Sequence, residues 1–430
     1  MTMTNILQIF KIKELRSKIL IVAFLLGCFQ ALSNVPIPVV SAEKFAGFLN
    51  AAQFFDSSQL LKFLSLFSGG GLEKLSIMML GVAPYITSTI IMQLLTMIFP
   101  RIKEMYYEEG EAGKAKFNRY SKYLTVPLGA LQSYGFLNLL ISQGVIPQMT
   151  LPQNLFNVLL ITAGTMILVW IGELISDQKI GNGVSLIIFA GIVAQLPRAV
   201  QNTLFSYDSS MLPTLIAFVI VGIAVVAGVV FIQEGERKIP VAYAKRVRGM
   251  KMYGGAASYL PLKVNQAGVI PIIFAISILL FPQFLAQISS IISSDLSLKL
   301  NDLVGKFFNN QYSYSAFYFV LVVVFTYFYT AITFDPKEIA KNLQRAGGFI
   351  AGIRPGESTA AMLSKIISRL TFSGAIFLGL IAILPNLTQI ITGIKFLTIG
   401  GTALLIVVSV ALEIMKQVNS QLIMREYEEI

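Results

Sequence analysis

Ten segments of this 430-residue chain contain no Asp, Glu, Lys or Arg, and all but two are long enough to cross a membrane as an α-helix. A helix rises about 1.5 Å per residue, so about 20 residues cover the hydrocarbon core of a bilayer. Charged residues make up 13% of the chain, against about 25% in ordinary soluble domains. The sequence therefore predicts an all-α polytopic membrane protein with ten transmembrane helices. The ten segments are 19–35, 75–99, 123–143, 154–172, 184–197, 211–232, 264–287, 312–334, 370–394 and 396–412.

The absence of Asp, Glu, Lys and Arg from these segments disfavours one class of membrane protein. Ion-coupled transporters and proton pumps usually carry such residues at membrane depth, where they are costly and functional. The chain also has no histidine and a single cysteine, Cys28, so we expect no zinc cluster, no disulfide and no catalytic histidine. The loop 108–122 lacks the glycine spacing of a phosphate-binding loop. We therefore expect no catalysis and no cofactor, and energy must come from a partner or from the proton-motive force.

The distribution of basic residues predicts the orientation of the chain in the membrane. With the N-terminus inside, 26 of the 33 Lys and Arg residues fall in cytoplasmic segments. Such a bias toward the cytoplasm sets the topology of membrane proteins, so both termini are expected in the cytoplasm. Five spans in each half also mean that the halves, 1–203 and 204–430, begin on opposite sides of the membrane. Any internal repeat would then be inverted, with a central pathway between the two halves.

The second segment contains polar residues and helix breakers that a simple membrane anchor does not need. Gly81 and Pro84 interrupt it, and Thr87 and Gln93 place polar groups near the middle of the membrane. Such groups are tolerated where neighbouring protein or a watery cavity satisfies them. Just before this segment, an apolar run too short to span, 60–67, leads into three consecutive glycines. This run is either a movable lid over a cavity or an external loop packed on the helices, and the residues leave both interpretations open.

Two cytoplasmic loops have the composition of folded regions. The loop 233–263 combines basic residues with tyrosines and with glycines typical of turns, which favours a docking surface over simple contact with anionic lipid. In the loop 334–370, the sequence predicts a helix capped by Asp335, followed by a tight turn at 352–356 with Arg354 at its tip. An arginine on a rigid turn suits an acidic partner or a phosphate. An arginine that is merely solvated explains the same residues.

Five long motifs, separately placed and in the right order, closely resemble the SecY family. Members of this family form the membrane channel of the bacterial protein-export translocon. The resemblance extends over about residues 10–427. The motifs are FSGGGLEKLSIMMLGVAPYITSTIIMQLLT (67–96), GNGVSLIIFAGIVA (181–194), LPLKVNQAGVIPIIFA (260–275), FDPKEIAKNLQRAGGFIAGIRPGEST (334–359) and GGTALLIVVSVALEIMKQ (400–417).

The resemblance implies two inverted five-helix halves around an hourglass pore, with a seam that opens toward lipid. A ring of branched apolar residues, mostly isoleucine in the family, closes the waist of the pore. Valine replaces isoleucine at two of the matching positions here, which makes the seal slightly looser. The matching ring residues are Val82, Ile86, Val184, Ile188, Ile273 and Ile406.

The resemblance also implies a plug below the ring and a lateral gate in the seam, and it favours the movable-lid interpretation of the run before the glycines. The plug covers about residues 60–70, and the polar residues of the gate match Thr87, Gln93 and Asn265. Hydrogen bonds across the closed gate would be exchanged for a passing signal helix. The plug residues are Leu60, Phe63, Leu64, Leu66, Phe67, Gly69 and Gly70.

The partners implied by the resemblance are those of a translocon in the cytoplasmic (inner) membrane. They are SecE-like and SecG-like small membrane subunits, the SecA motor ATPase, the ribosome, signal sequences, unfolded polypeptide and membrane lipid. The loops 233–263 and 334–370 match those that receive the ribosome or SecA, through Lys245, Arg246, Arg248 and Arg354. Met250 stands where some relatives carry an arginine.

The sequence thus predicts a channel that moves unfolded polypeptide outward and releases apolar segments sideways into lipid. A small-solute secondary transporter and a membrane scaffold for another enzyme are the alternatives.

Overall fold

The computed structural model describes residues 12–38, 65, 68–72, 74–142, 144–205, 212–243, 246–248, 251–253, 257–292, 294–392 and 401–428. The chain divides into two compact units. The first contains residues 1–209, 276–310 and 410–430, and the second contains residues 210–275 and 311–409. The first boundary lies close to the expected division at 203/204, whereas 276–310 and 410–430 group with the N-terminal part. The organisation into two inverted halves stays a prediction.

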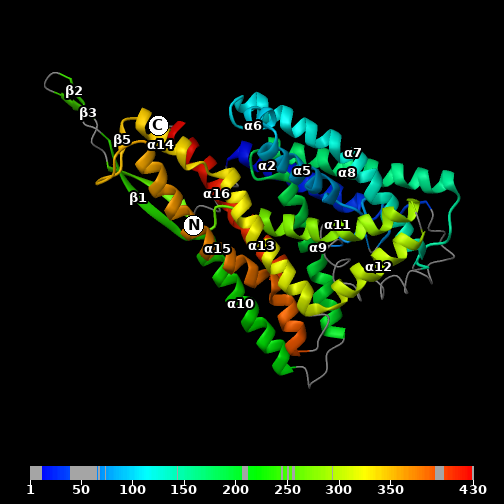
Figure 1. Cartoon of the computed structure of the whole chain (residues 1–430). Helices are drawn as coiled ribbons and strands as arrows, with labels where there is room; N and C mark the ends of the chain where they lie inside the picture. The colour runs from blue at the N-terminus through cyan, green and yellow to red at the C-terminus, as the bar shows by residue number, and fades with distance from the viewer. Residues whose placement is uncertain are drawn as a thin grey trace. The chain divides into compact units, whose positions relative to one another are not determined.

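The first unit is a packed helical bundle. Helix α7 contacts α5, α6 and α8, and α8 in turn contacts α2 and α9, as Figure 1 shows for α7 and α8. Glycines let α8 approach its neighbours closely, because a Cβ at Gly183 would overlap the carbonyl oxygen of Gly172 and a Cβ at Gly164 would overlap that of Ile77. The helices assigned wholly to this unit are α2 (Lys13–Leu32), α5 (Ala83–Ile98), α6 (Pro100–Tyr107), α7 (Gly110–Ser142), α8 (Leu151–Asp177), α9 (Gly183–Phe205) and α12 (Ser294–Asn309).

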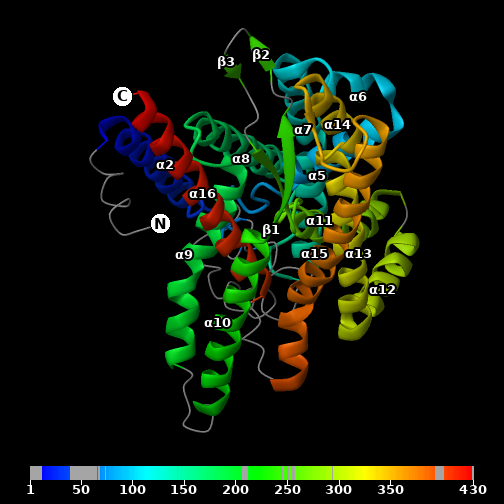
Figure 2. The ribbon, with the colours of Figure 1, turned by 90° about the vertical axis from the view of Figure 1, so that its left-hand side faces the viewer.

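The second unit combines helices with a small β-sheet. Helices α13 and α15 pack along each other, and both views show them side by side (Figures 1 and 2). Helices α11 (Ile270–Ile292) and α16 (Gly401–Glu428) each have residues in both units. The helices wholly in this unit are α10 (Leu212–Glu234), α13 (Gln311–Thr333), α14 (Pro336–Arg345) and α15 (Glu357–Thr392).

The strands lie in the two loops that were expected to dock partners, and the sequence analysis did not predict them. Strands β1 (Glu236–Tyr243), β4 (Ala257–Lys263) and β5 (Gly348–Phe349) form an antiparallel sheet in the order β4-β1-β5. Ile239 pairs with Leu260 in this ladder. Strands β2 (Arg246–Arg248) and β3 (Lys251–Tyr253) form a hairpin beyond the end of β1 (Figure 2). The fold is therefore mostly helical, with β-structure confined to these two loops within the described residues.

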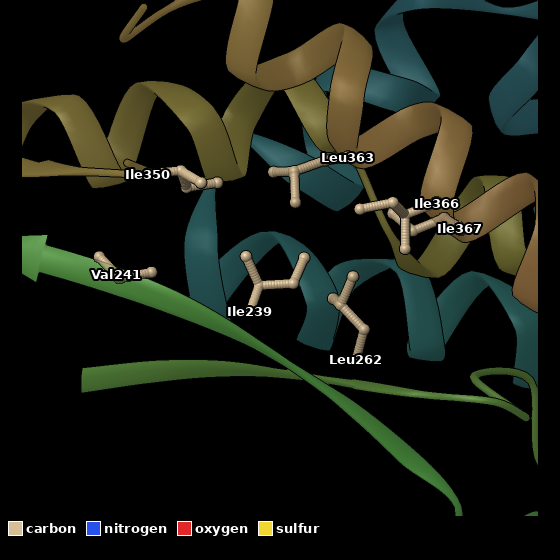
Figure 3. Close-up of a cluster of buried hydrophobic side chains, with 7 residues drawn as sticks. All are labelled: Ile239, Val241, Leu262, Ile350, Leu363, Ile366 and Ile367. Carbon is tan, nitrogen blue, oxygen red and sulfur yellow. The ribbon is translucent and has the colours of Figure 1, made fainter. Parts of the chain in front are cut away.

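A cluster of buried aliphatic side chains joins this sheet to the first turns of α15. Ile239, Val241 and Leu262 of the sheet face Leu363 of α15, which is fully buried (Figure 3). Ile350, Ile366 and Ile367 complete the cluster. Burial of such side chains contributes about 1.5–3 kcal/mol each. The cluster thus joins the sheet β4-β1-β5 and the first turns of α15 into one folded unit, which we call the platform.

Each of the ten expected spans overlaps a helix, but not every helix is long and apolar enough to span by itself. Seven helices meet that criterion within the described residues, and the bent pair α5 and α6 makes eight. The apolar described parts of α9 and α11, Gly183–Pro197 and Ile270–Leu279, are shorter. The count of ten transmembrane helices therefore stays a prediction.

The second expected span, 75–99, begins differently from the prediction. Residues 77–82 form turns, and the helix starts only at Ala83, with Pro84 in its first turn. Proline suits that position because the first N–H groups of a helix have no intrahelical acceptor. Gly81 has a φ of 56°, which lies outside the right-handed helical range, so a regular helix cannot continue through this residue. At Phe99 the chain bends by 111° into α6.

Candidate channel and docking platform

Five of the six residues expected in the pore ring lie on four helices, and the sixth, Val82, immediately precedes one of them. In the first unit, Val82 immediately precedes α5 and Ile86 lies in its first turn, and both are buried. Val184 and Ile188 are likewise one turn apart at the start of α9, where Ile188 is buried and Val184 half-buried. Each pair therefore has the i, i+4 spacing that places two side chains on one helix face.

The other two ring residues belong to the second unit. Ile273 of α11 is 6% exposed and Ile406 of α16 is 3% exposed. All six side chains are thus apolar, and five of them are buried. Their assembly into one ring stays a prediction.

The segment after the expected plug is held firmly at its C-terminal side. Residues 75–77 pair with the segment that follows α2, where Ile37 N donates to Leu75 O at 2.9 Å and Ile77 N donates to Val35 O at 3.0 Å. The Ser76 hydroxyl also donates to Leu32 O at 3.1 Å. These bonds fix the chain directly after the glycines.

Two of the three glycines have positive φ values. Gly69 and Gly70 have φ values of 62° and 80°, which other residues rarely adopt. A Cβ at Gly69 would lie 2.6 Å from Cζ of Phe29, so the turn also lies tightly against α2. Of the plug residues, Leu60, Phe63, Leu64, Leu66 and Phe67 lie outside the described residues.

On the N-terminal side of the glycines, one side chain from α9 reaches the segment. The Gln195 Nε2 atom donates to the backbone oxygen of Ser65 at 3.1 Å. The same oxygen accepts the backbone N–H of Gly70 at 3.0 Å. The sequence analysis missed Gln195. A signal was available, because Gln195 follows Ile188 by seven residues, two helical turns, and is the only polar side chain of the charge-free segment 184–197 besides Ser185.

Two of the three expected gate residues make local side-chain hydrogen bonds. Thr87 Oγ1 donates to Ala83 O of its own helix at 3.0 Å, and Asn265 Nδ2 donates to Gly268 O at 3.0 Å. The side-chain oxygens of Gln93 and Asn265 are buried and accept no hydrogen bond from the described residues. A buried amide oxygen without a donor is costly, so both atoms are suited to accept a hydrogen bond from an entering group.

The loop that carries Arg354 has the expected structure. The Asp335 carboxylate accepts from Lys337 N at 2.8 Å and caps α14, which begins at Pro336. The following turn has positive φ values at Gly352 and Gly356. Thr359 Oγ1 donates to the backbone oxygen of Arg354 at 2.9 Å, so the turn is tied to α15. The Arg354 side chain is exposed and pairs with none of the described residues.

The basic residues expected in the other docking loop are only partly described. Arg246 and Arg248 lie on β2, for which the backbone is described, and Lys245 lies outside the described residues. Asn182 caps α9, with its side-chain oxygen accepting from Ser185 N at 3.2 Å.

Solved structures with a similar fold define the class of the protein. A structure of a protein conducting channel matches 93% of this chain and 91% of its own at a TM-score of 0.61 and 19% identity. Sec61 in the canine ribosome-channel complex from the endoplasmic reticulum matches 94% of this chain and 91% of its own, at a TM-score of 0.60 and 19% identity. The fold is therefore that of the protein-conducting channels, a class of polytopic helical membrane proteins.

Sequence comparisons are more specific. The SecY family model matches residues 76–415. The protein translocase subunit SecY of Mycobacterium bovis is 41% identical over 432 residues, which cover 96% of each chain. That of Corynebacterium glutamicum is 41% identical over 442 residues, 99% of each chain, and that of Thermotoga maritima is 39% identical over 97% of this chain and 95% of its own. The chain belongs to the SecY family.

Proposed function

We propose that this protein is the protein-conducting channel of a bacterial translocon, which moves unfolded polypeptide across the cytoplasmic membrane and releases apolar segments into lipid. The observation that carries the proposal is the match of nearly the whole chain to SecY subunits named protein translocase, at about 41% identity. The activity is inferred from these relatives, and the residues of this chain indicate which parts of the channel carry it out.

The barrier of the channel is the set of six branched apolar side chains. Val82, Ile86, Val184, Ile188, Ile273 and Ile406 carry no hydrogen-bonding group, so a constriction lined by them can dewet and stop ions. A moving polypeptide passes such side chains without being held by specific bonds. The barrier is also expected to close again around a chain of varying side chains because aliphatic residues change rotamers readily.

The plug is proposed to move about the glycines at positions 69–71. Among the described residues, the C-terminal side of these glycines is fixed to α2 through Leu75, Ser76 and Ile77. The N-terminal side is held to α9 by the Gln195 side chain. A plug that opens would therefore break the Gln195 bond and keep the anchorage to α2. A gate of this kind has a closed state stabilised by only a few kcal/mol, because a ligand must shift its population.

Lateral release of apolar segments is proposed to use the seam that contains Thr87, Gln93 and Asn265. The unpartnered oxygens of Gln93 and Asn265 can accept donors from an entering segment. Hydrogen bonds inside membranes contribute about 0.6–2 kcal/mol each, so they are exchanged easily.

Docking of SecA or the ribosome is proposed to occur on the platform. The buried cluster around Leu363 holds the sheet and α15 together, and Arg354 is presented on a turn anchored by Thr359. A rigid support lowers the entropy lost when a partner binds. SecE-like and SecG-like subunits complete the proposed assembly, with both termini of the chain in the cytoplasm.

A reconstituted system tests this function. The chain is purified with its small membrane partners, placed in proteoliposomes and supplied with SecA, ATP and a precursor carrying a signal sequence. We expect the precursor to become resistant to external protease in an ATP-dependent manner. The proposal would be refuted if the precursor stayed fully accessible to protease while the same vesicles accumulated a small solute driven by an ion gradient. That result would support the transporter alternative.

A further inference from the structure

Helix α12 is connected at both ends to helices that are expected to cross the membrane. One residue separates it from α11, which ends at Ile292, and one residue separates it from α13, which begins at Gln311. A single extended residue spans at most about 3.6 Å. The sixteen residues of α12 have a length of about 24 Å. The helix therefore cannot move away from the membrane surface at which α11 ends and α13 begins.

The residues of α12 separate into an apolar and a charged face. Leu300, Leu303, Val304 and Phe307 recur at i, i+3, i+4 and i+7, the spacing of one helix face. The charged residues Lys299, Asp302 and Lys306 share a second face, displaced by about 120° at 100° per residue.

The exposure of the side chains matches this separation. On the apolar face, Leu303 is 67% exposed and Phe307 is 39% exposed. On the charged face, Lys306 Nζ lies 2.7 Å from Asp302 Oδ2, and both side chains are exposed. The apolar face thus needs a covering that the described residues of the chain do not supply at Leu303.

We propose that α12 lies in the membrane–water interface on the external side, with its apolar face inserted among the lipids of the outer leaflet. A helix with one apolar and one charged face is the form that binds to this layer, with the apolar side chains at the boundary between headgroups and acyl chains. The tethers to α11 and α13 hold α12 in that layer, where lipid covers Leu303 and the exposed part of Phe307. This inference rests on the membrane topology and not on the channel function.

The interfacial helix gives the external ends of α11 and α13 a fixed depth. Helix α11 also carries Ile273, one of the ring residues. Anchorage of its external end in lipid opposes sliding of that helix along the membrane normal when polypeptide passes.

Fluorescent labels on the two faces test the proposal in the full-length chain. Cys28 is replaced by Ser, because it is the only native cysteine, and a single cysteine is introduced as Leu303→Cys or, as the matched control, as Lys306→Cys. Each is labelled with the environment-sensitive dye NBD in phosphatidylglycerol–phosphatidylethanolamine nanodiscs. Quenching is then measured with lipid that carries a nitroxide near the headgroup and, separately, with aqueous iodide.

We expect at least threefold stronger quenching by the nitroxide lipid at position 303 than at position 306, and the reverse order with iodide. Equal quenching of both positions by iodide would show that α12 projects into water, and it would overturn the proposal. A label at position 303 that neither quencher reaches would show that protein covers this face, which also overturns it. A second pair, Phe307→Cys against Asp302→Cys, repeats the comparison if either first variant fails to fold.

Discussion

Replacing Gln195 by alanine is expected to open the proposed plug without disturbing the fold. The change removes the hydrogen bond from Nε2 to the Ser65 backbone oxygen at 3.1 Å. That oxygen still accepts the N–H of Gly70, so no buried acceptor is left unsatisfied. Loss of this bond should therefore destabilise the closed plug by an amount in the lower part of the range for one neutral hydrogen bond, about 0.5–1 kcal/mol. The population of the open plug should therefore rise about two- to fivefold.

Ion conductance of the resting channel in planar bilayers measures this effect, because leak is proportional to the open population while that population is small. Gln201→Ala is the matched control, since Gln201 lies on the same helix, is exposed, and bonds to none of the described residues. We expect a two- to fivefold rise in leak for Gln195→Ala and no change for Gln201→Ala. An unchanged leak in the first variant, or an equal rise in both, would refute the idea that α9 holds the plug through Gln195.

Three further predictions concern the ring, the platform and the packing of the bundle. Ile188→Asn should raise resting ion leak because an amide keeps the buried constriction wet, and unchanged conductance in planar bilayers would count against the ring. Arg354→Glu should reduce SecA-driven translocation at least tenfold by placing like charges at the contact, while thermal stability is retained because the side chain is exposed. Its control is Lys365→Glu, an equal charge change at an exposed site of α15; equal loss in both variants would argue against a specific contact. Gly183→Ala should lower the melting temperature in detergent by several degrees, because the new Cβ overlaps the backbone of Gly172 and overpacking costs about 1–3 kcal/mol. Gly222→Ala, where the Cβ meets open space, should leave the melting temperature unchanged or slightly higher, and a similar drop in both would contradict the packing argument.

The helices were predictable because the membrane imposes a simple rule on sequence. A segment without charges and of sufficient length must satisfy its backbone within a helix, and each expected segment coincides with one. Local end signals were equally readable, since Asp335 caps α14 and Asn182 caps α9 through the bonds that their side chains suggest. These features depend on a few adjacent residues.

Features that depend on distant residues were not predictable in the same way. The strand β1 pairs with β4 about twenty residues later and with β5 more than a hundred residues later, and its alternation of buried and exposed residues covers only a short stretch. Residues 75–77, which lie shortly before α5, bond to Val35 and Ile37 far earlier in the chain. The bond from Gln195 to Ser65 joins residues 130 positions apart, and no local pattern indicates such a pair.

Translocating polypeptide is proposed to pass the ring of apolar residues. Site-specific photocrosslinking tests this passage most directly. A photoreactive amino acid is placed at Ile188 of the proposed ring or, as the control, at Ile220 of α10, which is 61% exposed on an apolar helix. A precursor fused to a tightly folded domain is stalled during SecA-driven translocation and irradiated. The account predicts ATP-dependent crosslinks to the precursor from position 188 and none from position 220. Absence of crosslinks at position 188 in vesicles that do translocate the precursor, or equal crosslinking from both positions, would contradict it.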